Sequence, residues 1–349
     1  MLMGVTVHSK ATILGVSSYL PINRLTNEQL ATEYPEWSVD KIFDKTGIKS
    51  RPIASKEDSC SSMAIEASKR LFEKLKIEPS CIDYVLLCTQ SPDYKLPTTA
   101  CIVQHKLGIP TSAGALDFNL GCSGYVYGLS LAKGLIESGQ SKNVLLITSE
   151  LYSRYINDQD KSVRTLFGDA ATATLVGVTE SKNEYISGIV LGSDGAGGEN
   201  LIVPHGGSLN PTEVSSNVAT VDGSGNYRSL ADLYMNGAEI LTFTLKSVPK
   251  LVSNVLSKAN FDRADVDRVI FHQANKFMLD KLRKKTLFTE EQFLVSYEHY
   301  GNTVSSTIPL GLELAQNEGK LKQGDNVLLC GFGVGYSWAG AIIKWSDNA

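Results

Sequence analysis

The sequence has 349 residues, enough for two to three domain-sized units of roughly 150 residues each. Hydrophobic residues make up 42% and charged residues 20%, with 30 glycines and 11 prolines, a balance typical of a globular α/β protein and not of a disordered or fibrous one. The net charge is −4 and there is no long Lys/Arg run, and no apolar run approaches the roughly 20 residues of a membrane helix, so we expect neither a nucleic-acid nor a membrane partner.

The amino terminus and the cysteines indicate a cytoplasmic protein. Residues 1–10 lack the basic segment followed by an apolar one that marks a secretory leader. The six cysteines form no Cys-x-x-Cys pair, and a chain of this length does not need disulfides, so we expect reduced thiols. Each cysteine is then either a core residue or a reactive one.

Three short segments of the first half recur, in the same order, in the second half. Each pair shares its pattern of apolar positions, and each segment is typical of a buried strand or of the approach to one. The pairs are 82–88 with 266–272, 141–147 with 324–330, and 167–173 with 332–338. We therefore predict two related halves, residues 1–178 and 179–349.

Amphipathic segments lie between the predicted strands, as expected where helices cover a sheet. We predict helices over 62–75, 125–138 and 238–256, and hence a layered α/β fold. Residues 192–226 are rich in Gly, Ser, Asn and Pro, which indicates a long surface excursion of the kind that often borders a substrate channel.

Cys122 stands out because it lies in a Gly-Cys-Ser-Gly turn between a predicted strand and a predicted helix. Such a turn leaves the sulfur accessible and places it at the positive end of the helix dipole, which favours the nucleophilic thiolate. Cys122 is therefore the candidate nucleophile.

The repeat brings two further side chains toward Cys122. Cys122 lies 17 residues before Gly139, and Asn302 lies 17 residues before Gly319, so the two occupy matching positions at the heads of matching helices. His272 ends the strand that matches the one ending in Cys88. We expect Cys122, His272 and Asn302 to meet near the axis that relates the halves.

These residues carry a resemblance to a known family. The sequence resembles the thiolase-fold condensing enzymes, specifically the β-ketoacyl-acyl-carrier-protein synthase III family, over nearly its whole length. Cys122 falls in the family's Gly-Cys-x-Gly turn, His272 in its His-Gln-Ala-Asn motif and Asn302 in its Tyr-Gly-Asn-Thr motif. The resemblance implies a thiolase-like fold, in which two duplicated halves form layers in the order αβαβα.

The resemblance also implies a reaction. A primer acyl group passes from coenzyme A to Cys122, a malonyl thioester loses carbon dioxide, and the resulting enolate attacks the acyl-cysteine to give a β-ketoacyl product. His272 and Asn302 hold the enolate oxygen, while the backbone amides of Cys122 and Val334 hold the oxyanion of the tetrahedral intermediate. No metal and no resident cofactor are expected, because coenzyme A enters as part of the substrate.

Four residues match family positions that contact coenzyme A. Trp37 and Lys161 fall where the family binds the adenine end, Lys45 stands where an arginine is usual, and Asn275 lies near the pantetheine arm. Because the Lys ammonium acts as a point charge, Lys45 cannot bind a phosphate through two parallel hydrogen bonds as an arginine would.

Three further positions concern the acyl pocket and the partners. Leu96 matches the position at which one subunit of a homodimer closes its partner's acyl tunnel, and the edge strand near Asp117 is expected at the same interface. Val334 stands where the family has glycine, and Phe277 replaces a basic residue, which leaves both an acyl carrier protein and coenzyme A open as the malonyl carrier.

Three other functions fit parts of the sequence. An acyltransferase could pass the acyl group from Cys122 to another acceptor, although retention of Asn302 favours condensation. Synthesis of 3-hydroxy-3-methylglutaryl-CoA needs an acidic base where this chain has the amide Gln90. A non-catalytic partner subunit usually lacks the nucleophile, and Cys122 is present.

Overall fold

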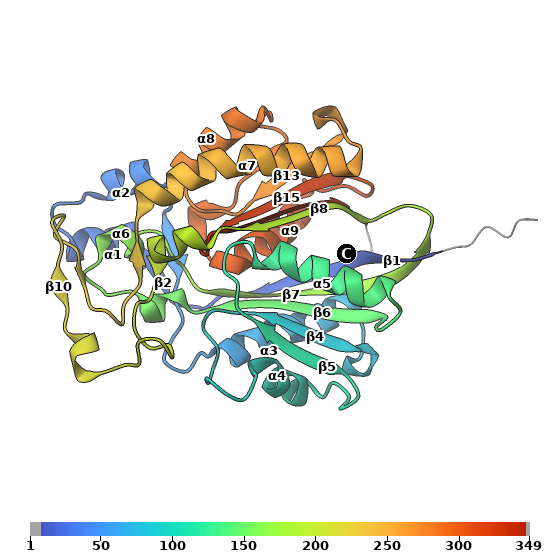
Figure 1. Cartoon of the computed structure of the whole chain (residues 1–349), viewed down its shortest axis with the longest axis horizontal. Helices are drawn as coiled ribbons and strands as arrows, with labels where there is room; N and C mark the ends of the chain where they lie inside the picture. Colours follow the sequence, from blue (N-terminus) through green and yellow to red (C-terminus); the bar gives the residue numbers. More distant parts are fainter. Residues whose placement is uncertain (1–7, 347–349) are drawn as a thin grey trace, which may run out of the picture.

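The computed structural model describes residues 8–346, which form two five-stranded sheets with helices between and outside them (Figure 1). The expectation about the amino terminus therefore falls mostly outside the described residues.

The first sheet belongs to the first half of the chain. Its order is β1-β7-β6-β4-β5, with β4 parallel to both β5 and β6, and with β7 antiparallel to β6 and β1. Its strands are β1 (His8–Tyr19), β4 (Tyr84–Cys88), β5 (Gly114–Phe118), β6 (Asn143–Glu150) and β7 (Ala170–Ser181). The central strands are nearly continuous apolar runs because both of their faces are buried.

The second sheet repeats the first strand by strand. Its order is β8-β16-β15-β13-β14, with the same pattern of parallel and antiparallel pairs. Its strands are β8 (Ile186–Ser193), β13 (Arg268–Phe271), β14 (Phe293–Leu294), β15 (Asn326–Gly333) and β16 (Ser337–Lys344). The predicted duplication and the thiolase-like fold class are both confirmed.

Helices complete the αβαβα layers. Between the sheets lie α5 (Gly124–Glu137) and α9 (Thr307–Asn317), whose side chains share one core with both sheets. The helix α5 is apolar on nearly all sides because protein surrounds it. The outer layers are α3 (Cys60–Leu75) with α4 (Thr99–Leu107) on the first sheet, and α7 (Gly237–Ala259) with α8 (Lys276–Thr286) on the second.

Smaller elements cluster at one end of the molecule, to the left in Figure 1. They are α1 (Asn27–Glu33), α2 (Val39–Thr46), α6 (Lys161–Arg164), β2 (Arg24–Thr26) and β3 (Ser50–Pro52). The predicted excursion, residues 192–226, carries two 3₁₀ turns (Gly195–Asn200 and Val214–Asn217) and the short strands β9 (Leu201–Ile202) and β10 (Thr220–Val221). Two more short strands follow it, β11 (Tyr227–Arg228) and β12 (Tyr234–Met235).

The two halves join between β7 and β8, close to the predicted boundary, and the division at residue 178 remains a prediction. No helix within residues 8–346 combines the length and the apolar character needed to cross a bilayer.

Candidate active site

The turn that carries Cys122 connects the edge strand β5 to the central helix α5. The N–H of Gly124 donates to the carbonyl of Gly121 at 2.8 Å and closes the turn, so Cys122 lies two residues before the helix begins. Glycine is required where β15 passes the thiol, because a Cβ on Gly333 would lie 2.8 Å from the sulfur of Cys122. The nucleophile is therefore buried at a seam where both halves meet.

Burial raises the pKa of the Cys122 thiol to about 12, and the nearby Glu150 carboxyl raises it further, whereas the amides of Val334 and Cys122 oppose the rise. The sequence predicts a helix start that favours the thiolate, and burial opposes it strongly enough to keep the thiol protonated at neutral pH. The sequence places a helix start beside the sulfur, but desolvation depends on the packing of both sheets. The thiol must lose its proton as it attacks.

The backbone amides of Val334 and Cys122, predicted for the oxyanion hole, both lie close enough to the Cys122 thiol to lower its pKa. Val334 is held by Ser337, whose hydroxyl donates to the Val334 carbonyl at 2.8 Å and lies 2.7 Å from the hydroxyl of Ser123 beside the nucleophile. The Val334 side chain packs toward Gly121, where an added Cβ would lie 2.5 Å from its Cγ1. It is not among the residues that line the cavity at Cys122.

Asn302 has its side-chain amide fixed in one orientation. The backbone N–H of Val304 donates to Asn302 Oδ1 at 2.9 Å, which leaves the two N–H groups of Nδ2 free to donate. The Asn302 backbone bridges to the first half, because its N–H donates to the Leu166 carbonyl at 2.8 Å and its carbonyl accepts from Gly168 at 3.0 Å. The asparagine is thus positioned by both halves of the chain.

His272 follows β13 and is also oriented by its neighbours. Its Nδ1 lies 2.8 Å from the Thr307 hydroxyl at the start of α9, so Nε2 is the ring nitrogen left for the cavity. The Phe332 ring packs against the imidazole in a T-shaped arrangement, with centroids 5.6 Å apart. Burial lowers the pKa of His272 to about 3, so the ring is neutral at physiological pH.

Val304 links these two side chains. Its N–H holds Asn302, and its carbonyl accepts from the Thr307 hydroxyl at 3.0 Å, which in turn contacts His272. Val304 is fully buried and has a φ of +56°, a strained value for a β-branched residue. One strained residue therefore supports both predicted side-chain donors, which the sequence did not reveal.

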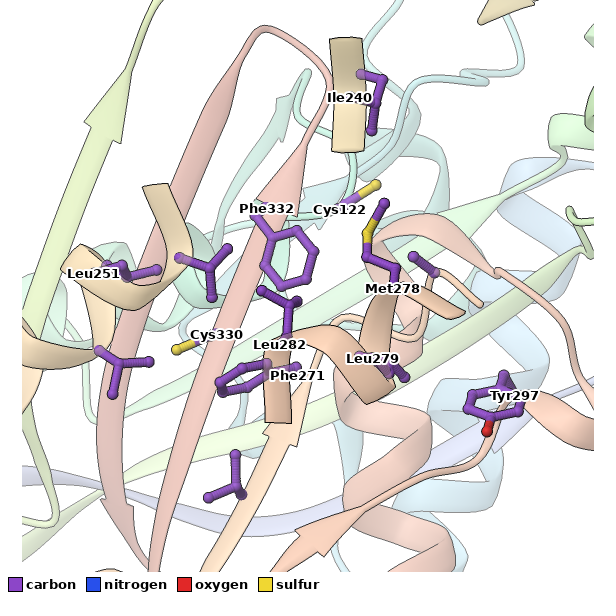
Figure 2. Close-up of a cluster of buried hydrophobic side chains, with 14 of the residues drawn as sticks. Cys122, Ile240, Leu251, Phe271, Met278, Leu279, Leu282, Tyr297, Cys330 and Phe332 are labelled. Atoms are coloured by element: carbon purple, nitrogen blue, oxygen red, sulfur yellow. The ribbon is translucent and has the colours of Figure 1, made fainter. Parts of the chain in front are cut away.

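Cys122, His272 and Asn302 line one cavity of about 80 Å³, as the sequence predicted. Figure 2 shows Cys122 beside Ile240, Met278 and Phe332, which also line this cavity. The remaining walls come from several separate segments of the chain and are mainly apolar: Leu166, Phe167, Leu201, Met235, Gly237, Thr244, Ala274, Asn275 and Gly333.

Trp37, Lys45 and Lys161 lie together away from this cavity. The ammonium of Lys45 sits 4.7 Å from the centre of the Trp37 ring, and Lys161 pairs with Glu36 at 2.5 Å. The cluster connects to the site through α2, because a Cβ on Gly47 at the end of that helix would lie 2.5 Å from the Cβ of Lys276. Lys276 is the residue after Asn275, which lines the cavity.

Asn275 and Leu96 have other surroundings. The Asn275 side chain caps α8 by accepting from Met278 N–H at 2.9 Å, which leaves its amide N–H groups free. Leu96 is 82% exposed and does not contribute to the cavity of its own chain. Phe277 is exposed as well, and Lys281 lies over its ring at 4.7 Å.

Glu150 is a second titratable group that the sequence did not single out. It ends β6 fully buried, and it accepts from the Ser305 hydroxyl at 2.6 Å and from Gln90 N–H at 3.0 Å. Burial raises its pKa to about 8. The Gln90 side chain accepts from the Tyr152 hydroxyl and donates to Asn119, so both the oxygen and the nitrogen of this amide have partners.

The remaining cysteines and histidines do not join the site. Cys88 and Cys330 are fully buried strand residues, as predicted. His299 has a side chain that is 61% exposed. Across the described part of the chain, no group of three or more His, Cys, Asp or Glu residues is arranged to hold a metal ion.

The duplicated sheets around a buried, glycine-flanked cysteine define the class: the chain is a condensing enzyme with the thiolase fold. The family profile described as 3-oxoacyl-[acyl-carrier-protein] synthase III matches residues 116–195, and the profile for its C-terminal part matches residues 256–345. The chain belongs to this family, whose enzymes form carbon–carbon bonds by decarboxylative Claisen condensation.

Individual relatives agree over nearly the whole length. The β-ketoacyl-[acyl-carrier-protein] synthase III of Caldanaerobacter subterraneus subsp. tengcongensis is 38% identical over 96% of this chain and 98% of its own. A crystal structure of a 3-oxoacyl-(acyl-carrier-protein) synthase III superimposes with a TM-score of 0.95 at 50% identity, covering 96% of this chain and all of that one. The corresponding enzyme of Burkholderia xenovorans LB400 gives a TM-score of 0.88 at 35% identity, covering 97% of this chain and 96% of that one.

Proposed function

We propose that this enzyme loads an acyl group from an acyl-CoA primer onto Cys122 and condenses it with a malonyl thioester to give a β-ketoacyl thioester. The observation that carries the proposal is the single cavity lined by Cys122, His272 and Asn302. One thioester carbonyl can meet a nucleophile and two side-chain donors there.

In the loading step, the sulfur of Cys122 attacks the primer carbonyl. The oxyanion that forms is stabilised by the amides of Cys122 and Val334, each worth about 3 kcal/mol by analogy with single oxyanion-hole donors. The intermediate collapses by breaking the bond between the carbonyl carbon and the coenzyme A sulfur. The thiol proton ends on that departing sulfur, and His272, whose neutral ring lines the cavity, carries it only transiently because its pKa is about 3.

In the condensing step, the malonyl group loses carbon dioxide, and the electron pair becomes an enolate. Asn302 Nδ2 donates to the enolate oxygen. His272 Nε2 donates to it as well in the tautomer that carries the ring proton on Nε2, which requires the single Thr307 hydroxyl proton to turn from the Val304 carbonyl to Nδ1. The enolate carbon then attacks the acyl-cysteine. The cysteine sulfur leaves, takes a proton from solvent and returns to its resting state.

We place coenzyme A along the path from the cavity to the cluster of Trp37, Lys45 and Lys161, with Asn275 beside the pantetheine arm. The malonyl carrier is proposed to be an acyl carrier protein, which the names of the relatives specify. Its binding surface would be the basic helix α8, which begins at the cavity. No resident cofactor is required, because the donors are protein N–H groups.

We further propose a cytoplasmic homodimer. The strand β5 is an edge strand, and Leu116 on it is 43% exposed, while Leu96 is 82% exposed. Pairing of two β5 edges would cover Leu116 and bring Leu96 of one subunit toward the other. Size-exclusion chromatography with light scattering tests the dimer directly.

The decisive experiment incubates the protein with a panel of acyl-CoA primers and with malonyl thioesters on both coenzyme A and acyl carrier protein. We expect carbon dioxide release and a β-ketoacyl product, with an acyl group on Cys122 seen by intact mass. Absence of decarboxylation with every primer and carrier would refute the proposal. Discharge of acyl-Cys122 only by an alcohol or amine would instead identify an acyltransferase with a different acceptor.

A further inference from the structure

Thr244 is a cavity residue whose hydroxyl has no partner. Within residues 8–346, the buried side-chain oxygen or nitrogen atoms that lack a hydrogen bond are the hydroxyls of Thr12, Thr244 and Thr303. Of these three residues, Thr244 alone lines the cavity at Cys122. It is fully buried in α7, so bulk water does not satisfy its hydroxyl.

An internal partner is available to this hydroxyl and is not used. A threonine within a helix can donate to the carbonyl four residues earlier. Thr242, two residues before Thr244 in the same helix, does this toward Ala238 at 2.9 Å. Thr46 and Thr286 do the same at 2.8 Å in α2 and α8. Thr244 forgoes the bond to Ile240, although burying an unpaired hydroxyl costs free energy.

The surroundings indicate what would supply the missing bond. Thr244 lies one turn after Ile240, and both line the cavity together with Ala274, Asn275 and Met278 at the start of α8. The helix α8 is the one that adjoins α2 and the Trp37 and Lys45 cluster. Thr244 therefore shares the cavity with the residues at the start of α8, which connect it to the proposed coenzyme A site.

A pantetheine arm could supply the hydrogen-bond partner that the Thr244 hydroxyl lacks. It alternates methylene groups, which suit the apolar side chains, with amide groups, and the nearer amide is separated from the sulfur by two methylenes. A hydroxyl can donate to the amide carbonyl or accept from the amide N–H. We propose that Thr244 is a binding residue that hydrogen-bonds an amide of the pantetheine arm when a thioester occupies the site. The inference rests on the proposed function, because it assumes thioesters carried on pantetheine.

The test follows single-turnover acylation of Cys122 by intact mass, with one acyl group presented on coenzyme A, on N-acetylcysteamine and on ethanethiol. The first two carriers hold the nearer amide, and the third has none. Thr244→Val keeps the shape and removes the hydroxyl. We expect it to raise the half-saturating concentration of acyl-CoA and of the N-acetylcysteamine thioester about five- to tenfold, with the maximal rate nearly unchanged. The S-ethyl thioester should react equally with both proteins.

Two controls separate binding from structure. Thr244→Ser should restore the affinity for acyl-CoA to within about twofold, since it restores the hydroxyl. Thr242→Val, in which the lost hydroxyl was already paired within the helix, should leave acylation unchanged. Thermal unfolding of Thr244→Val should occur at or above the wild-type temperature, because the variant removes an unpaired buried group.

Two results would overturn the inference: an unchanged half-saturating concentration of acyl-CoA in Thr244→Val, or an equal penalty on the S-ethyl thioester. The second result would place the effect in the acyl chain or in cavity shape. Failure of the proposed function looks different, because wild-type protein would then form no acyl-Cys122 with any of the thioesters, and the inference would fall with it.

Discussion

The heads of the two central helices are matching positions in the duplicated halves, yet they are built differently. In the first half, α5 begins two residues after Cys122, so the nucleophile meets the helix directly. In the second half, a 3₁₀ turn at Val304–Ser306 precedes α9, and Asn302 lies five residues before the helix. The short connection exposes a reactive atom to two backbone amides, whereas the longer one folds back to orient a side-chain amide.

This difference teaches how one architecture supports two kinds of charge stabilisation. At Cys122 the proposed donors are backbone N–H groups, which side-chain substitutions other than proline leave in place. At Asn302 the proposed donor is a side chain whose orientation depends on the N–H of the strained residue Val304. Loading and decarboxylation should therefore be separable by mutation.

The largest expected effect comes from removing the side chain of Cys122 or that of Asn302. Cys122→Ala should abolish acylation and reduce condensation at least about 10³-fold, while decarboxylation of the malonyl thioester continues, since its proposed donors lie in the other half. Asn302→Ala should give the reverse pattern, with Cys122 still acylated and decarboxylation slowed about 10²- to 10³-fold. Intact mass and carbon dioxide release measure the two steps. Loss of both steps in both variants would show that the halves do not act separately.

A smaller effect is expected where β15 passes the nucleophile. Gly333→Ala would place a Cβ 2.8 Å from the Cys122 sulfur, so the sulfur or the strand must shift. We expect acylation to slow about 10- to 100-fold, since a misplacement of the reacting atom by about 1 Å is costly. Gly134→Ala on α5 is the matched control, because no atom lies within 4 Å of its added Cβ and alanine favours helix. Unimpaired loading by Gly333→Ala would contradict the tight approach seen here.

The smallest effect concerns stability and pH at the buried end of β6. Burial raises the pKa of Glu150 to about 8 from its ordinary value near 4.5. Between these values the unfolded chain ionises the carboxyl while the folded chain keeps its proton. Glu150 therefore makes the free energy of unfolding fall as pH rises from about 4.5 to about 8, and its contribution is level above that.

Glu150→Gln mimics the protonated carboxyl and removes this dependence. Urea unfolding at pH 5 and at pH 8 should show that the variant gains stability relative to wild type as pH rises. An equal change in the free energy of unfolding of the two proteins between pH 5 and pH 8 would show that Glu150 is ionised in the folded protein, as an ordinary carboxyl is.

Much of the fold and the centre of the site could be predicted from the sequence. The repeated apolar patterns required matching strands, and the equal spacing of Cys122 and Asn302 from Gly139 and Gly319 placed them at matching helix heads. Both glycines indeed have positive φ just after their helices end. These signals are local, so the sequence retains them.

What could not be predicted depends on contacts between distant segments. The raised pKa of Cys122 reflects desolvation by both sheets, which no local pattern encodes. Leu201 reaches the cavity from the excursion at 192–226, which has no periodicity, and Met235 reaches it from the segment that follows. Thr244 looks in sequence like its neighbour Thr242, and only the packed structure reveals that one hydroxyl is paired and the other is not.

The backbone bridge between Phe167 and Asn302 bears on when the chain becomes active during its synthesis. The two residues are more than a hundred positions apart in the sequence, and both line the cavity at Cys122. While only the first half has been synthesised, the chain contains Cys122 but not Asn302. We therefore expect that the nascent chain cannot yet consume malonyl thioesters. Catalytic competence arrives late in synthesis, with the closing of that seam.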